Sequence, residues 1–129
     1  EIFEHFGAQL HRTTIVHWWR TWAPGLVANA TRAGLDVIVS PDPAWYLDSI
    51  ETAWQAAYTV EPCEGLSEGQ CAHVIGGGGE MWGERVDGSD LEATVWPKLA
   101  AIAERLWSPR GAKGPRRAAN TGASPGVAR

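Results

Sequence analysis

The alternation of apolar and polar positions predicts three short β-strands. The first is the β-branched run Thr13–Val16, which leads into His17-Trp18-Trp19-Arg20, and the second is Leu35–Val39, closed by Ser40-Pro41. The third, at residues 73–75, runs into four consecutive glycines. Short apolar runs rich in β-branched residues and bounded by turn residues are typical of buried strands.

Helical periodicity separates and follows these strands. We expect a short helix that opens near Pro24 and ends at Gly34, a second helical stretch at about residues 49–58, and a final helix that starts near Pro97 and ends at Ser108-Pro109. The final helix has the clearest pattern, an apolar stripe formed by Val95, Leu99, Ile102 and Leu106. A stripe of this kind packs on another part of a fold.

Strands that alternate with helices predict an α/β fold with parallel pairing and right-handed crossovers. Three such units are too few for a doubly wound sheet or a closed barrel, so the predicted architecture is incomplete. In (β/α)₈ barrels the reactive groups lie at the carboxyl ends of strands. Aromatic and acidic residues occupy the three predicted strand ends, namely Trp19, then Tyr46 and Asp48, then Trp82 and Glu84.

Composition and charge narrow the range of partners. The 129 residues are 44% hydrophobic and 20% charged, with no apolar run of membrane-spanning length. Residues 109–129 hold five bases and no acid and are rich in Gly, Pro and Ala, which predicts a disordered tail. The rest of the chain is acidic, which argues against nucleic acid as the main partner. No targeting peptide is recognised at the start of the sequence.

Cysteines and histidines give weaker indications. Cys63 and Cys71 flank a loop that a disulfide could close, and their spacing permits this bond without requiring it. The four histidines are scattered, so we expect no metal site and no cofactor. Asn29-Ala30-Thr31 matches an N-glycosylation sequon but falls on the predicted helix, which favours a chance match.

Eight tryptophans are several times the usual number for 129 residues. They could serve core packing, or they could stack on sugar rings, whose C–H faces suit flat indoles while carboxylates accept hydrogen bonds from hydroxyls. The composition leaves both uses open. Trp45 is expected to pack beneath its loop, and the helical positions of Trp54, Trp96 and Trp107 favour the core.

Five motifs in order carry a resemblance to a known family: Trp45-Tyr46-Leu47-Asp48, Glu61-Pro62, Met81-Trp82-Gly83-Glu84, Trp96-Pro97 and Ala103-Glu104-Arg105-Leu106-Trp107-Ser108. In this order and spacing they resemble the last third of the catalytic barrel of glycoside hydrolase family 20, the β-N-acetylhexosaminidases. The resemblance implies that residues 1–108 form about three β/α units at the C-terminal end of a TIM (β/α)₈ barrel, with residues 109–129 as a separate tail.

The resemblance also implies roles for the residues at the strand ends. In this family the 2-acetamido oxygen of the substrate attacks its own anomeric carbon, an exception to the two-carboxylate scheme. Tyr46 matches the residue that donates to this oxygen, and Trp19 and Trp82 match walls around the acetamido methyl. Asp48 and Glu84 match carboxylates that accept hydrogen bonds from sugar hydroxyls. From the residues alone, Asp48 could instead be a helix-start carboxylate and Glu84 a solvated loop acid.

The general acid of the family is not found in this sequence. The family carries it in an adjacent Asp-Glu pair, and no Asp is followed by Glu here. We therefore expect the chain to supply part of a sugar pocket and to be inactive alone, while the parent enzyme removes terminal N-acetylglucosamine or N-acetylgalactosamine from glycans. The family implies a lysosomal or secreted location, although the sequence itself leaves the compartment and a dimeric parent open.

Two other functions compete with this hypothesis. The chain could be a non-enzymatic protein that binds N-acetylated sugars or a partner through the same residues. It could also belong to another class of barrel glycosidase, although that class leaves Trp-Tyr-Leu-Asp and Trp-Gly-Glu unexplained.

Overall fold

The computed structural model describes residues 2–6, 9–23 and 25–109. Its elements, in chain order, are α1 (Ile2–Phe6), β1 (Ile15–Trp18), α2 (Leu26–Arg32), β2 (Asp36–Val39), α3 (Trp54–Thr59), α4 (Glu68–Cys71), β3 (Val74–Gly77), α5 (Leu91–Val95) and α6 (Lys98–Trp107). Pro24 and the predicted disordered tail from residue 110 lie outside the described residues, so the two-part division of the chain stays a prediction.

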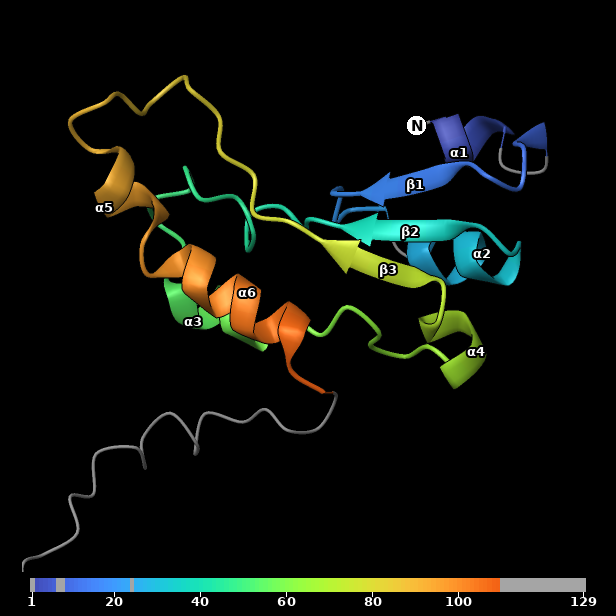
Figure 1. Ribbon diagram of the computed structural model, residues 1–129. Helices are drawn as coiled ribbons and strands as arrows, with labels where there is room; N and C mark the ends of the chain where they lie inside the picture. The colour runs from blue at the N-terminus through green and yellow to red at the C-terminus, as the bar shows by residue number, and fades with distance from the viewer. Residues whose placement is uncertain (1, 7–8, 24, 110–129) are drawn as a thin grey trace, which may run out of the picture.

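The three strands form one parallel sheet in the order β1-β2-β3, which confirms the α/β class. In Figure 1 their arrowheads point the same way, so their carboxyl ends meet at one edge. The first strand was predicted two residues too early. Thr13 and Thr14 instead form a turn, in which the Thr14 amide donates to the His11 carbonyl and the Thr13 amide donates to the His11 ring.

Helices cover one face of the sheet and enclose the core. α2 packs against β1 and β2, and α3 runs beside α6 (Figure 1). The core contains the buried side chains Val16, Leu26, Ala30, Leu35, Val37, Val39, Trp45, Leu47, Ala57 and Ile102. Because side chains of a strand alternate between faces, Val37 and Val39 share this buried side of β2.

Trp45 is the largest fully buried side chain, and it connects the sheet to the helices. Its indole N–H donates to the carbonyl of Ala57 in α3, at 3.0 Å. A buried indole needs such a partner for its N–H. The expectation that Trp45 is structural is therefore confirmed.

The final helix differs from the predicted stripe at its start. Val95 belongs to the separate helix α5, because Trp96 and Pro97 interrupt the helical path before α6 begins at Lys98. The buried positions of α6 are Lys98, Ala101, Ile102 and Arg105. Two cations therefore lie on the buried face of the helix, which a search for apolar periodicity does not detect.

The prediction that three further tryptophans lie in the core was wrong for the described part of the chain. Trp54 is 38% exposed, Trp96 is 55% exposed and Trp107 is 89% exposed. Trp96 lies between α5 and α6, and not on a helix. Trp107 lies two residues after the buried Arg105, so it points to the opposite side of α6.

Three smaller expectations can also be compared with the structure. The helical stretch predicted at 49–58 begins only at Trp54, because residues 49–52 form turns. Cys63 and Cys71 form a disulfide. The sequon lies within α2, where Thr31 is buried and its hydroxyl donates to the Val27 carbonyl, which agrees with a chance match.

Among the described residues, no helix is both long and apolar enough to cross a membrane.

Candidate functional site

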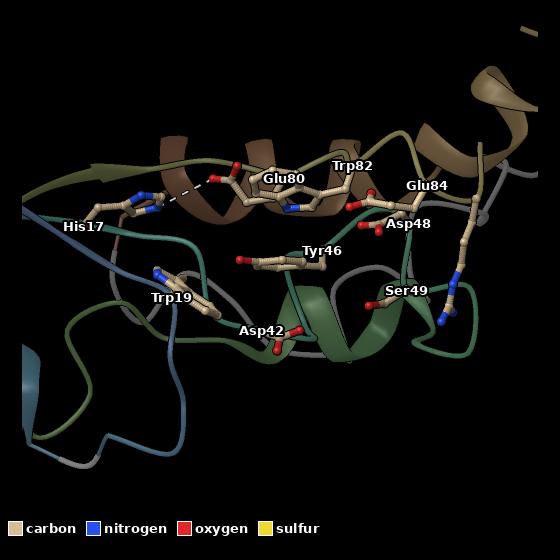
Figure 2. Close-up of a pocket in the computed structure, with 10 residues that line it drawn as sticks. His17, Trp19, Asp42, Tyr46, Asp48, Ser49, Glu80, Trp82 and Glu84 are labelled. Carbon is tan, nitrogen blue, oxygen red and sulfur yellow. Dashed lines mark ion pairs between the residues drawn. The ribbon is translucent and has the colours of Figure 1, made fainter. Parts of the chain in front are cut away.

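A pocket of about 800 Å³ opens at the carboxyl edge of the sheet, and Figure 2 shows its lining. The segments that follow all three strands contribute to it. The lining residues are His17, Trp19, Asp42, Tyr46, Asp48, Ser49, Glu80, Trp82, Glu84 and Arg85. All five site residues predicted from the sequence, Trp19, Tyr46, Asp48, Trp82 and Glu84, therefore line one pocket.

Aromatic rings occupy the middle of the pocket. Tyr46 lies between Trp19 and Trp82 in Figure 2. The ring centroids of Trp19 and Tyr46 are 6.5 Å apart, with an angle of 38° between the planes. Trp19 is supported from outside the pocket by the edge of Trp22, at a centroid distance of 5.4 Å, and by the Arg20 guanidinium 5.0 Å from its ring. Trp82 is half exposed, so its indole is accessible from solvent.

The Tyr46 hydroxyl keeps its proton more firmly than a free tyrosine. Burial raises its pKa above the usual 10.0, and the negative charges of Asp42, Glu80 and Asp48 raise it further. A side-chain hydrogen bond with Trp82 acts in the opposite direction without reversing the shift. At neutral pH the phenol is therefore a hydrogen-bond donor into the pocket.

Carboxylates lie at one end of this aromatic group. Asp48, Ser49 and Glu84 all line the pocket and lie toward the same end of it in Figure 2. One carboxylate oxygen of Asp48, Oδ1, is buried and has no hydrogen-bond partner within the described ranges, whereas Glu84 is exposed at the rim. Such oxygens can accept hydrogen bonds from hydroxyl groups of a bound molecule.

An ion pair lies at the opposite end of the pocket. His17 Nε2 and a carboxylate oxygen of Glu80 are 3.6 Å apart, as marked by the dashed line in Figure 2. Glu80 is held by the backbone, since its carbonyl accepts from the Leu47 amide and its own amide donates to the Trp45 carbonyl. These backbone hydrogen bonds form an isolated parallel β-bridge between Tyr46 and Glu80, which brings the segment after β3 alongside Tyr46.

Sequence reasoning did not predict His17, Asp42, Ser49, Glu80 or Arg85 as pocket residues. For His17 a signal was present, because it alternates on β1 with the buried Val16 and the partly buried Trp18 and so faces the other side of the sheet. The position of Glu80 depends on its pairing with Tyr46, which the sequence does not reveal.

Close packing explains part of the glycine run before Trp82. A Cβ built on Gly77 would lie 2.4 Å from the Val39 carbonyl oxygen and 2.5 Å from the Trp45 ring. At Gly79 a Cβ would lie 3.2 Å from side-chain atoms of Ile102 and Leu99. These two glycines let β3 and its continuation lie directly against the core, which fixes the approach to the pocket.

Comparison with known proteins agrees with this geometry. Residues 1–110 match the model of the glycosyl hydrolase family 20 catalytic domain. The chain is 48% identical over 110 residues to beta-hexosaminidase 3 of Arabidopsis thaliana and 39% identical over 112 residues to the beta subunit of human beta-hexosaminidase. Each alignment covers 84% of this chain, and the chain spans 20% of the length of each relative.

Solved structures of the same family also superpose on the chain. A crystal structure of a beta-N-acetylhexosaminidase matches with a TM-score of 0.74 and 29% identity, covering 83% of this chain and 26% of that protein. The Flavobacterium johnsoniae chitobiase matches with a TM-score of 0.70 and 32% identity, over 80% of this chain and 16% of that protein. These matches rule out another class of barrel glycosidase, and the chain belongs to glycoside hydrolase family 20.

Proposed function

We propose that this chain forms one side of the sugar pocket of a β-N-acetylhexosaminidase, as about three β/α units from the C-terminal end of its TIM barrel. The observation that carries the proposal is the convergence of Trp19, Tyr46, Asp48, Trp82 and Glu84 on one pocket, from segments after three different strands. The substrates of the whole enzyme are glycans that end in N-acetylglucosamine or N-acetylgalactosamine.

The aromatic centre suits the acetamido group of such a sugar. Indole faces at Trp19 and Trp82 would enclose the methyl group and hold the acetamido oxygen bent toward the anomeric carbon. The protonated Tyr46 hydroxyl would donate to that oxygen. As the oxygen attacks, the acetamido group becomes positively charged in a cyclic intermediate, and the phenol keeps the group in its attacking orientation.

The acidic end of the pocket suits the hydroxyls of the same sugar. Asp48 offers a buried oxygen that has no hydrogen-bond partner among the described residues, and Glu84 offers oxygens at the rim. Each would accept a hydrogen bond from a hydroxyl and so set the orientation of the ring. In this proposal neither residue transfers a proton to the leaving group.

The proton for the leaving group comes from outside this sequence. The family resemblance assigns it to an adjacent Asp-Glu pair, and the sequence has no Asp followed by Glu. The chain would therefore bind sugar without cleaving it. A terminal sugar would occupy both the aromatic middle and the acidic end of the pocket, whose total volume is about 800 Å³.

Sugar binding by the 129-residue chain tests the proposal. Titration with N-acetylglucosamine should give a saturable change in tryptophan fluorescence, and Trp82→Ala should abolish it. Trp107→Ala is the matched control, because Trp107 is 89% exposed and does not line the pocket. No saturable change with the folded wild-type chain, or an equal loss in both variants, would refute the assignment.

A further inference from the structure

A buried ammonium group holds the loop that carries two of the proposed sugar contacts. Lys98, the first residue of α6, is 6% exposed. Its Nζ donates to three backbone carbonyls, those of Tyr46 at 3.1 Å, Leu47 at 3.1 Å and Ser49 at 2.7 Å. An ammonium has three N–H donors, so these three bonds use all of them.

The three carbonyls belong to one turn, and that turn also places side chains in the pocket. Tyr46, Asp48 and Ser49 line it, while Leu47 points into the core. Carbonyls that converge on one cation repel each other when the cation is removed, and buried carbonyls without partners are costly. The turn is therefore expected to keep its shape only while a hydrogen-bond donor lies where the three carbonyls converge.

Charge adds a second connection between Lys98 and the pocket. Burial lowers the pKa of Lys98, and the negative charge of Asp48 raises it in return. The Oδ1 atom of Asp48 is itself buried and has no hydrogen-bond partner in the part of the chain that the structure describes. Lys98 therefore interacts with Asp48 through charge as well as with the backbone of the same turn.

We propose that Lys98 is a positioning residue for sugar recognition, which sets the Tyr46 hydroxyl and the Asp48 carboxylate at the spacing that one terminal N-acetylhexosamine requires. It touches no substrate and acts through the backbone of residues 46–49. The proposal rests on the proposed function of the pocket, although the effect of Lys98 on Tyr46 can be measured without sugar.

Arg105 provides a matched control on the same helix. It lies seven residues after Lys98 on the same buried face and is 8% exposed. Its guanidinium donates to the Val60 carbonyl and to the Glu61 carboxylate, neither of which lines the pocket. Both cations therefore connect α6 to backbone carbonyls of distant segments. Lys98 binds the turn that lines the pocket, whereas Arg105 binds residues that do not line it.

The sugar test compares three variants by the affinity for N-acetylglucosamine, with circular dichroism as the check of folding. We expect Lys98→Met to weaken binding about tenfold, equivalent to about 1.4 kcal/mol. Lys98→Arg keeps the charge and several N–H donors, so it should stay within about threefold of the wild type. Arg105→Met should lower the urea midpoint and leave the affinity of the folded protein within about twofold.

The sugar-free test uses a Tyr58→Phe background, in which Tyr46 is the only tyrosine. Alkaline titration of tyrosinate absorbance then reports the Tyr46 pKa. Because burial is the first cause of the raised pKa, release of the turn by Lys98→Met should move the pKa downward toward 10.0, while Arg105→Met leaves it in place. Lys98→Gln keeps two N–H donors without the charge and replaces Lys98→Met if that variant does not fold.

The two tests separate the two proposals. A wild-type chain that binds no sugar, together with a Tyr46 pKa that falls in Lys98→Met, would refute the sugar pocket and support the positioning of the turn. A chain that binds sugar equally well with and without the ammonium, at an unchanged Tyr46 pKa, would refute the role of Lys98. Equal losses in Lys98→Met and Arg105→Met would also refute it.

Discussion

The ring of Tyr46 faces the indole of Trp19 at a centroid distance of 6.5 Å, although 26 residues separate them in the sequence and each follows a different strand. The parallel register creates this proximity, because β1 and β2 pair over their whole length and end side by side at Trp18 and Val39. Both side chains then project from the same edge of the sheet. The proposed contacts with the acetamido group follow from this arrangement.

The Tyr46 phenol should titrate above the usual tyrosine pKa of 10.0, and its absorbance change should disappear in Tyr46→Phe. Glu80→Gln removes one of the negative charges that raise the pKa, so the pKa should fall in that variant. The raised pKa also means that the folded state binds this proton more tightly than the unfolded state. Its contribution to the free energy of unfolding is therefore complete below pH 10 and declines as the pH rises through the raised pKa.

An unchanged Tyr46 pKa in folded Glu80→Gln would contradict the described proximity of the two side chains. Asp42→Asn offers a second check, because Asp42 also raises the pKa and lies at another part of the pocket wall.

Gly77→Ala should destabilise the chain by about 1–3 kcal/mol, as expected where a methyl group meets a packed core and a fixed backbone. Its Cβ would lie 2.4 Å from the Val39 carbonyl oxygen. Gly76→Ala is the matched control, since among the described residues no atom beyond Gly76 and its two chain neighbours lies within 4 Å of the corresponding Cβ. Urea unfolding compares the two variants, and equal midpoints would show that β3 does not lie as close to β2 as described.

Replacement of the disulfide by serines at Cys63 and Cys71 should lower the free energy of unfolding by about 2–3 kcal/mol, the chain-entropy value for such a short loop. The bond joins the segment before α4 to the end of that helix, and neither cysteine lines the pocket. The affinity for sugar in the folded variant should therefore match that of the wild type. A disulfide-free variant as stable as the wild type would contradict this contribution of the bond.

The chain alone should not hydrolyse a chromogenic N-acetylglucosaminide, because neither Asp48 nor Glu84 is proposed to protonate the leaving group. The measurement is release of the chromophore, with a full-length family member as the positive control. Turnover above the buffer rate that is lost in Glu84→Gln would contradict the proposed division of roles.

Local sequence patterns were sufficient for the parts of the fold that depend on short-range periodicity. β2, β3 and the central part of α6 lie where β-branched and helical spacing predicted them. The buried indole of Trp45 also agreed with its expected structural role. Errors arose at boundaries, where a turn at Thr13–Thr14 and the Trp96-Pro97 break competed with the periodic pattern.

Local sequence patterns could not predict the contacts between segments that are distant in the sequence. No sequence pattern indicates that Lys98 is buried, and its burial is understood only when the turn at residues 46–49 presents three carbonyls to it. Glu80 enters the pocket through pairing with Tyr46. Motif resemblance and position at the strand ends indicated the same five side chains, and these line one pocket in the structure, while their roles stay a prediction.

The most direct test of the central claim compares the affinities of N-acetylglucosamine and glucose for the wild-type chain and Tyr46→Phe. These two sugars differ in the acetamido group, which Tyr46 is proposed to contact. We predict that the wild type binds N-acetylglucosamine more tightly than glucose and that Tyr46→Phe loses most of this preference, while its affinity for glucose stays within about twofold of the wild type. Equal affinity of the folded wild type for both sugars, or a preference that Tyr46→Phe retains in full, would contradict the account.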